Sequence, residues 1–563
     1  MDVKTVDFNH YFSNDEVASV LNAWAEEFPQ LATVTELGKS HEGRAILLLT
    51  LTNRNTGTDE DKPAIWIDAN IHAEEVAGTT VALHAAHTLL SGHGSDSRCT
   101  RLLDDAAFYI VPRLNPDGAA LALADSPQYV RSGTRPYPYA EKLAGLHDED
   151  IDGDGRLLQM RLRDPNGDWK VSSLDNRLME KRGPDEHEGE FYRLLPEGRL
   201  EEFDGLEIKL ARPLQGLDFN RNFPFEWQPE STQAGSGPYP VSEKEIRAAV
   251  AFISGHNNIS VALTYHTQGG IILRPFSTKP DEKMETNDLW VFELMGERGK
   301  DITGYPCISV FHDFRYHPKE VTTGAFDDWV YDYLGMFSFT IELWDLPGRA
   351  GVKDRDFIEW VRKHPHEDDL KILKWLEENG DGPPLVEWYP FEHPQLGPIE
   401  IGGYDRMYTW RNPPRSIMGE EAAFNTAYAL TLADMLPRLR LHTLESERLT
   451  GEGDYRLRLV VENSGFLPTY TSAQGRTRNA ARPVRAELDL PQGVQLVSGK
   501  AKTELGHLEG RSNRLAVSTM YAASPTDNRA WREWILRGAP GDIIQVHVLS
   551  DRAGTLRETV VLQ

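Results

Sequence analysis

Residues 65–78 read IWIDANIHAEEVAG, and this stretch decides how the first part of the chain is built. An apolar run typical of a buried strand stops at Asn70, and helical spacing begins at about Val76. His72, Glu74 and Glu75 lie between the two. A histidine and a glutamate three residues apart can bind one metal ion when a strand and a helix fix the turn. Zinc accepts both ligand types at about 2.0–2.2 Å, and a catalytic zinc needs a third protein ligand and an open position.

The His-x-x-Glu pattern alone is weak evidence for a metal site. It starts at five histidines in this chain: His72, His187, His317, His364 and His442. Four of these lie in charged or polar surroundings, where a solvated surface pair is the simpler interpretation. Only His72 and Glu75 follow an apolar strand and precede a helix, which is where ligands bind in open α/β sheets.

The composition narrows the class of protein. The chain has 563 residues and a formal net charge of −27, which disfavours nucleic acid or an anionic membrane as the main partner. No apolar run is long enough to cross a bilayer, and the start lacks the features of a signal peptide. We therefore expect a cytoplasmic protein, or a secreted one if a leader was removed. With two cysteines, Cys99 and Cys307, a disulfide framework is not expected.

Strands and helices alternate through the first part of the chain, which predicts an α/β fold. We expect a mixed, mainly parallel sheet with helices on both faces. The alternation breaks at about residue 119, where a long charged insertion runs to about residue 215. From about residue 440, short alternating runs separated by Gly, Pro, Asn and Asp favour an all-β sandwich. The predicted domains are residues 1–438 and 439–563.

Three further stretches carry side chains suited to a catalytic site. SVALTYHTQGG (residues 260–270) is an apolar strand that ends in His266. MFSFTIELWD (336–345) alternates so that Glu342 faces away from its apolar residues. A carboxylate there is costly unless it is paired, solvated or used in chemistry. GLDFNRNFP (216–224) places Asn220 beside Arg221, whose planar fork suits a carboxylate. A structural role remains the alternative for each.

Together these stretches resemble the M14 zinc carboxypeptidases, the carboxypeptidase A and B family. GKSHEGRAI (38–46), IHAEE (71–75), LNPDG (114–118), GLDFNRNFP, TYHTQGG and SFTIELWD appear in the order of that family's motifs. The resemblance implies that zinc is held by His72, Glu75 and His266. It also implies that Glu342 is the general base that takes a proton from the attacking water and passes it to the leaving amine.

The resemblance also implies how a substrate is held. Asn220 and Arg221 would bind the terminal α-carboxylate of a peptide or protein, which makes the enzyme an exopeptidase. Arg131, in QYVRSGTR, would stabilise the oxyanion, with Arg135 as the alternative. Asp327, in FDDW, takes the position at the pocket base, where an acidic residue would favour substrates with C-terminal Lys or Arg.

Two features depart from the family pattern. The position expected for a tyrosine on a mobile loop holds Glu320, and Tyr316 lies four residues earlier. The insertion is far longer than the family requires, and it contains HDEDIDGDGR (147–156). Acidic residues alternate there as in calcium loops, so we expect either a calcium site or an acidic turn, formed by Asp148, Asp150, Asp152 and Asp154.

Two other functions remain open at this stage. A zinc-dependent amidohydrolase acting on N-acyl amino acids would use the same ligands, although the Asn220–Arg221 pair favours a carboxypeptidase. A catalytically inactive relative that binds peptides is the second alternative, but neither Glu342 nor a predicted zinc ligand is lost. For the C-terminal β domain we expect a role in stability or docking.

Overall fold

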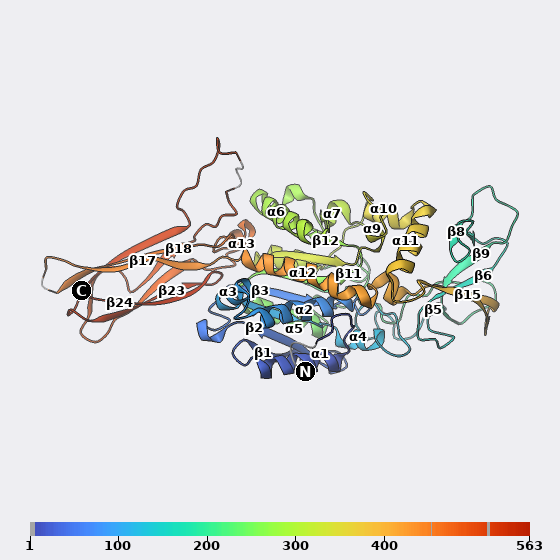
Figure 1. The fold of residues 1–563 in the computed structure, drawn as a ribbon, viewed down its shortest axis with the longest axis horizontal. Coiled ribbons are helices and arrows are strands. Elements are labelled where there is room, and N and C mark those ends of the chain that lie inside the picture. Colours follow the sequence, from blue (N-terminus) through green and yellow to red (C-terminus); the bar gives the residue numbers. More distant parts are fainter. Residues whose placement is uncertain (1–5, 452, 515–517) are drawn as a thin grey trace.

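The computed structural model describes residues 6–451, 453–514 and 518–563. The molecule is elongated, with an α/β body in the middle and β structure at both ends (Figure 1). An eight-stranded sheet in the order β1-β2-β4-β3-β11-β14-β12-β13 forms the body. Its strands are β1 (Ala32–Lys39), β2 (Ala45–Leu51), β3 (Ala64–Ala69), β4 (Ala107–Val111), β11 (Ile259–Thr267), β12 (Ile271–Arg274), β13 (Cys307–Ser309) and β14 (Phe337–Leu343). The neighbours β4, β3, β11 and β14 run parallel, whereas β2 and β12 join them antiparallel. The predicted mixed sheet is confirmed.

Helices cover both faces of this sheet. Trp66 packs against Phe252 of α5 (Lys244–Gly255), with ring centroids 5.6 Å apart. Ala69 lies three residues further along β3 and therefore faces the opposite side of the sheet. There it contacts α2 (Ala77–Gly92), since a Cβ added to Gly78 would lie 3.1 Å from the Ala69 Cβ. The helices are α1 (Asn14–Glu27), α2 (Ala77–Gly92), α3 (Ser97–Asp105), α4 (Pro116–Ala122), α5 (Lys244–Gly255), α6 (Thr286–Thr303), α7 (Val310–Asp313), α8 (Phe326–Leu334), α9 (Leu346–Arg349), α10 (Phe357–Arg362), α11 (His366–Asn379), α12 (Arg415–Asp434) and α13 (Ala473–Arg478).

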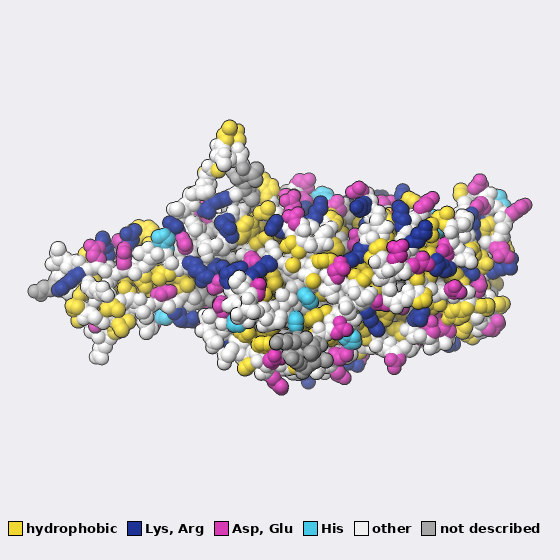
Figure 2. Space-filling model, in the orientation of Figure 1, with side chains coloured by type: hydrophobic (Ala, Val, Ile, Leu, Met, Phe, Trp, Pro, Cys, Tyr) yellow, Lys and Arg dark blue, Asp and Glu magenta, His cyan; other side chains and the backbone are white. Residues whose placement is uncertain are grey.

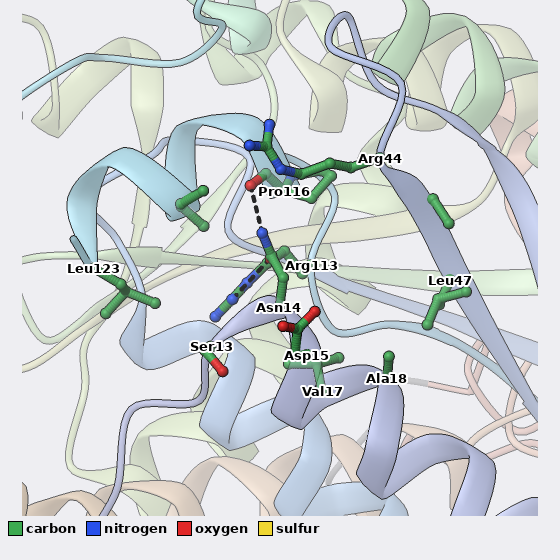
Figure 3. Close-up of a pocket in the computed structure, with 13 residues that line it drawn as sticks. Ser13, Asn14, Asp15, Val17, Ala18, Arg44, Leu47, Arg113, Pro116 and Leu123 are labelled. Carbon is green, nitrogen blue, oxygen red and sulfur yellow. Dashed lines mark hydrogen bonds between the residues drawn. The ribbon is translucent and has the colours of Figure 1, made fainter.

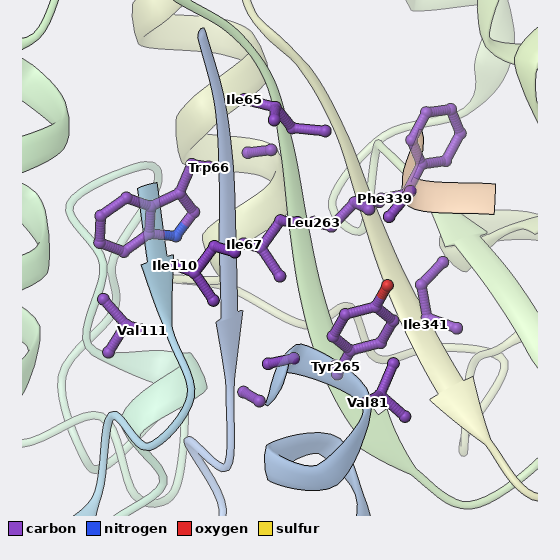
Figure 4. Close-up of a cluster of buried hydrophobic side chains, with 14 of the residues drawn as sticks. Ile65, Trp66, Ile67, Val81, Ile110, Val111, Leu263, Tyr265, Phe339 and Ile341 are labelled. Atoms are coloured by element: carbon purple, nitrogen blue, oxygen red, sulfur yellow. The ribbon is translucent and has the colours of Figure 1, made fainter. Parts of the chain in front are cut away.

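The core explains why the central strands read as continuous apolar runs. Side chains of β3, β4, β11 and β14 meet those of α2 in one buried cluster (Figure 4). Ile67, Leu263 and Phe339 are fully buried at its centre. Because helices shield both faces of a parallel sheet, neither face of these strands needs to be polar. Polar residues are therefore informative where the strands end.

The insertion forms most of a second β region. It contributes β5 (Gly145–Asp148), β6 (Gln159–Arg163), β7 (Trp169–Val171), β8 (Met179–Lys181), β9 (Tyr192–Pro196) and β10 (Gly198–Glu201). A six-stranded sheet, ordered β15-β16-β6-β9-β7-β8, joins four of them to β15 (Leu385–His393) and β16 (Gly397–Tyr404). Residues beyond 380 thus complete a sheet that the insertion begins, which the sequence did not predict.

The C-terminal region consists of two antiparallel sheets, as the fold class predicted. One contains β17 (Leu439–Arg448), β18 (Asp454–Asn463), β22 (Arg529–Arg537) and β20 (Gln495–Ser498). The other contains β21 (Lys502–Gly506), β19 (Val484–Asp489), β23 (Ile543–Ser550) and β24 (Gly554–Val561). A separate apolar core includes residues of both sheets. The predicted boundaries at 438/439 and 119–215 stay predictions.

Polar contacts fasten the C-terminal sheets to the α/β body. Arg552, 1% exposed, donates to the carbonyl oxygens of Ile259 and Leu334. Asp288 of α6 accepts hydrogen bonds from the backbone N–H groups of Ala473 and Gln474 at 2.7 and 2.9 Å. A buried arginine whose donors reach backbone carbonyls fixes one unit against the other, because separating them would leave those groups unsatisfied. The expected role of this domain in stability or docking stays a prediction.

The surface mixes both signs of charge. On the face shown in Figure 2, Lys and Arg side chains lie between Asp and Glu side chains over most of the α/β body. Within the described ranges, no helix combines the length and the apolar character needed to cross a bilayer.

Candidate metal centre and active site

Three ligating side chains meet at the carboxyl edge of the central strands. His72 and Glu75 lie in the turn between β3 and α2, and His266 lies near the end of β11, which runs parallel to β3. The Glu75 Oε2 atom is 3.0 Å from both His72 Nδ1 and His266 Nδ1. The two Nδ1 atoms are also 3.0 Å apart. One ion about 2 Å from each atom would fit this triangle, so the residues suit zinc.

The turn that carries His72 and Glu75 is held by two asparagines. Asn70 adopts a left-handed backbone conformation with φ of 57°, and its Nδ2 donates to the His72 carbonyl oxygen at 2.6 Å. Asparagine tolerates this conformation better than most residues, which explains why the apolar run ends there. Asn412, fully buried, accepts from the Ala77 N–H at 3.0 Å and donates to the Glu74 carbonyl oxygen at 2.8 Å.

Neighbouring side chains orient the two histidines. His72 Nε2 lies 3.1 Å from Asp218 Oδ1. A proton on that nitrogen would be donated to Asp218, leaving the Nδ1 lone pair for a metal. His266 Nε2 is 3.4 Å from Thr264 Oγ1, whose hydroxyl donates to Asp68 at 2.7 Å. Burial raises the pKa of Asp68 to about 6. Asp218 was not predicted as a functional residue, although it lies in the GLDFNRNFP stretch.

The electrostatics around Glu75 suit a cation ligand. Burial by itself raises the pKa of a carboxyl group, but His72 and His266 hold the Glu75 pKa well below its ordinary value. Glu75 therefore presents a carboxylate to the centre of the triangle. Glu74 is equally buried at 1% exposure, but it does not belong to the group of potential ligands.

Glu342 lies beside the ligand group on the neighbouring strand. β14 pairs with β11 in parallel register, which places Glu342 opposite His266. Burial, followed by the negative charge of Glu75, raises the Glu342 pKa to about 7. A carboxyl group with that pKa can both take up and release a proton near neutral pH.

Of the two arginines predicted as candidates for the oxyanion role, the structure places one near the ligands. Arg131 Nη1 lies 3.0 Å from Glu75 Oε1, and its Nε donates to Asp218 at 3.2 Å. Arg135 instead pairs with Glu243 at 2.6 Å. The geometry favours Arg131.

The predicted substrate-binding residues share one cavity with the ligand group. A cavity of about 50 Å³ is lined by His72, Arg131, Asn220, Arg221, His266, Tyr316, Asp327 and Glu342, among others. Asn220 Oδ1 accepts from the Phe326 N–H at 2.8 Å, so its amide N–H donors are left for a ligand. Tyr316 lines this cavity, whereas Glu320 does not.

Asp327 lines the same cavity. It is 3% exposed, and Leu273, Val310 and Phe314 line the cavity with it. Its Oδ1 accepts from the Asp328 N–H at 3.1 Å. Burial raises the Asp327 pKa, and no ion pair to it is found among the described residues.

The acidic loop of the insertion forms a different group. Asp150, Asp152 and Glu197 bring carboxylate oxygens within 4.8 Å of one another. Asp148 instead pairs with Arg406 at 2.9 Å, and Asp154 does not join the group. The structure therefore brings two of the four predicted aspartates together, and it adds Glu197, which was not predicted. Calcium binding stays a prediction.

Other cavities lie away from these ligands. One of about 520 Å³ opens between α1, β2 and α4, lined by Asn14, Arg44, Arg113 and Leu123 among others (Figure 3). Arg113 donates to the Asn14 side chain at 3.0 Å. None of the residues assigned to the metal centre lines this cavity.

Comparison with known proteins agrees with the geometry. The zinc carboxypeptidase family matches residues 17–351, and a domain family of unknown function matches residues 438–561. Rat carboxypeptidase A2 is 24% identical over 382 residues, which cover 64% of this chain and 72% of that protein.

Two further comparisons are weaker. The inactive metallocarboxypeptidase ECM14 of Saccharomyces cerevisiae is 34% identical over 113 residues, or 20% of this chain and 26% of that one. The crystal structure of thrombin activatable fibrinolysis inhibitor aligns with a TM-score of 0.43 and 17% identity, covering 76% of this chain and 74% of that one. Because the family match covers more than half of the sequence, the chain belongs to the zinc carboxypeptidase family.

Proposed function

We propose that this protein is a zinc-dependent metallocarboxypeptidase that removes single C-terminal residues from peptides, with a preference for Lys and Arg. The observation that carries the proposal is one cavity lined by the two histidines of the ligand group, by Glu342 and by the Asn220–Arg221 pair. A binding site for a terminal carboxylate next to a hydrolytic centre suits an exopeptidase.

The residues divide the chemistry between them. Zinc bound by His72, Glu75 and His266 would polarise the scissile carbonyl and lower the pKa of water towards 7. Glu342 takes a proton from the attacking water and passes it to the leaving amine, which its position beside His266 allows. The Arg131 guanidinium stabilises the negative charge that develops on the carbonyl oxygen.

The N–H groups of Asn220 and Arg221 form the proposed binding site for the terminal carboxylate of the substrate. Arg221 donates to its neighbour's carbonyl oxygen at 2.7 Å through Nη1, and its Nη2 lies 3.9 Å from Asp218. Further N–H groups of its planar fork, with the Asn220 amide, can bind both oxygens of a terminal carboxylate.

Asp327 supports the preference for basic residues. A buried carboxylate without a cationic partner is costly, and a substrate Lys or Arg side chain entering the cavity would supply that partner. The apolar side chains beside it would contact the methylene groups of such a residue. Asp327→Ala should abolish trimming of C-terminal Arg while sparing C-terminal Phe. Unchanged selectivity would count against this role.

The two alternative functions differ from this proposal in the substrate that is bound or in whether it is hydrolysed. An N-acyl amino acid amidohydrolase would use the same centre but would need no peptide upstream of the scissile bond. An inactive peptide-binding relative would bind without hydrolysis, and the match to ECM14 motivates keeping this alternative in the test.

The test uses peptides that differ only in the last residue, Arg, Lys, Phe, Leu or Glu, incubated with and without a zinc chelator and followed by mass spectrometry. We expect chelator-sensitive loss of single C-terminal residues, fastest for Arg and Lys, and no trimming by Glu342→Gln. Trimming of none of the peptides would overturn the proposal, and cleavage of N-acyl amino acids alone would favour the amidohydrolase.

A further inference from the structure

Arg411 reaches the metal centre from a part of the chain outside the family match. It ends a π-helical segment, Arg406–Arg411, between β16 and α12. Its Nη1 donates to the carbonyl oxygen of Thr267, the residue after His266, at 3.2 Å. Its Nη2 lies 3.9 Å from Glu74 Oε1. The adjacent residue, Asn412, holds the turn of the ligands His72 and Glu75, so the segment is part of the site.

The insertion holds Arg411 in this position through Tyr129. The Tyr129 hydroxyl accepts from Arg411 Nη2 at 2.6 Å and from Nε at 3.1 Å. The Arg406 guanidinium lies over the Tyr129 ring, 4.3 Å from its centroid, and pairs with Asp148. Tyr129 is two residues from Arg131, so one short segment positions both arginines.

Glu74 lies between the two guanidinium groups. Its Oε1 is 3.7 Å from Arg131 Nη1 and 3.9 Å from Arg411 Nη2. Within the described residues, its buried Oε2 has no hydrogen-bond partner. At these distances neither arginine donates a hydrogen bond to Glu74, so the pairing with Glu74 does not occupy their N–H donors. Arg411 also makes three hydrogen bonds out of five N–H donors, which leaves two donors for a ligand.

The two remaining N–H donors of Arg411 lie outside the cavity that would hold the terminal residue of a substrate. Arg411 does not line the cavity that contains Asn220, Arg221 and Asp327. Its side chain is 24% exposed, so solvent or a ligand reaches it. A peptide whose terminal residue fills that cavity and whose scissile carbonyl lies at the ligand group must continue outside the cavity.

We infer that Arg411, held by Tyr129, binds main-chain carbonyl groups of the peptide upstream of the scissile bond. This inference rests on the proposed carboxypeptidase function and gives it a substrate class: peptides of several residues rather than short N-acyl amino acids. The insertion then takes part in substrate binding, because it supplies the tyrosine that fixes the arginine.

The experiment compares an acetylated dipeptide with an acetylated hexapeptide that shares its last two residues. Arg411→Ala should lower kcat/KM for the hexapeptide by about 10- to 100-fold through KM, the range for a lost charge-assisted hydrogen bond. It should change the dipeptide value by less than about threefold, with zinc content unchanged. Tyr129→Phe keeps the ring and removes the acceptor, so it should give a smaller loss of the same kind.

Arg415→Ala is the matched control, because Arg415 is exposed and its guanidinium lies over the Tyr408 ring. It should leave the ratio between the two peptides unchanged. Equal losses for both peptides in Arg411→Ala would indicate a structural role and overturn the inference, as would no loss at all.

Failure of the proposed function is visible separately, as a wild-type protein that cleaves neither peptide. In that case calorimetry with Glu342→Gln and the Glu342→Gln/Arg411→Ala double variant still decides the inference. We expect weaker binding of the hexapeptide in the double variant, and equal affinities would overturn it.

Discussion

The molecule contains two groups of potential metal ligands, one around His72 and one around Asp150, and they differ in what surrounds them. The first is fully buried, and the second is half-buried except for Glu197. In the first, the atoms Nδ1 of both histidines and Oε2 of Glu75 face each other. In the second, Asp150 accepts backbone N–H groups of its own loop, from Gly153 and Gly155.

The difference shows what distinguishes a ligand set from an acidic turn. Around His72, other residues such as Asp218 supply hydrogen bonds that aim the ligands inward. In the second group, Asp150 already accepts hydrogen bonds from backbone N–H groups of its loop. Glu197 accepts from the N–H groups of Ile151 and Leu158. Only the first group needs a cation to explain its arrangement.

The largest expected effect separates the two groups directly. His72→Ala should lower zinc affinity by about 10³-fold or more, because each ligand carries a large share of the binding free energy. Peptide trimming should disappear with the metal. Asp152→Ala, in the second group, is the control and should leave zinc content and trimming at wild-type values. Loss of zinc from the control would break the comparison.

Asp218→Asn tests the residue that aims His72. The isosteric change removes the charge that faces the imidazole and Arg131. We expect zinc affinity to fall by about 10- to 100-fold, measured by competition with a chelator of known affinity. An affinity equal to wild type would mean that Asp218 does not orient the ligand.

The pH dependence of the free energy of unfolding tests the second group, through Glu197. Burial raises the pKa of Glu197 from 4.5 to about 7. The folded protein therefore binds this proton more tightly than the unfolded chain. The resulting stabilisation, up to about 3 kcal/mol, is fully present below about pH 4.5 and is lost as the pH rises through about 7.

Thermal melts in the absence of calcium, between pH 5 and pH 8, would measure this. The wild-type protein should lose more stability over this interval than Glu197→Gln, which cannot titrate. Parallel curves for the two proteins would show that Glu197 is ionised in the folded protein at pH 5.

The smallest expected effect is that of calcium. If Asp150, Asp152 and Glu197 bind the ion, saturating calcium should raise the melting temperature by roughly 2–4 °C. The increase should vanish in Asp150→Asn. An unchanged melting temperature of the wild-type protein would leave the second group as an acidic turn.

Local patterns were sufficient to predict much of the fold. The apolar run that stops at Asn70 predicted a buried strand, and β3 is buried throughout and ends at Ala69. The apolar runs that became β3, β11 and β14 predicted where polar residues would lie at the strand ends. Parallel strands bring those ends to one edge, so the meeting of His72 with His266 follows from the pattern.

The contacts that the sequence did not reveal join distant segments. Arg411 meets Thr267 and Tyr129 across more than a hundred residues, and β16 pairs with β6 in the insertion. Local periodicity in the sequence does not reveal contacts between distant segments, because each partner alone resembles an ordinary surface residue. Glu197 was missed for the same reason, since its relation to Asp150 depends on the fold of the insertion.

The most direct measurement is anomalous X-ray scattering at the zinc absorption edge from crystals of the full chain. We expect one strong peak within about 2.0–2.2 Å of His72 Nδ1, Glu75 Oε2 and His266 Nδ1, and none beside Asp150. Absence of a peak at the first group in zinc-supplemented crystals, or a peak only at the second, would contradict the assignment of the metal centre.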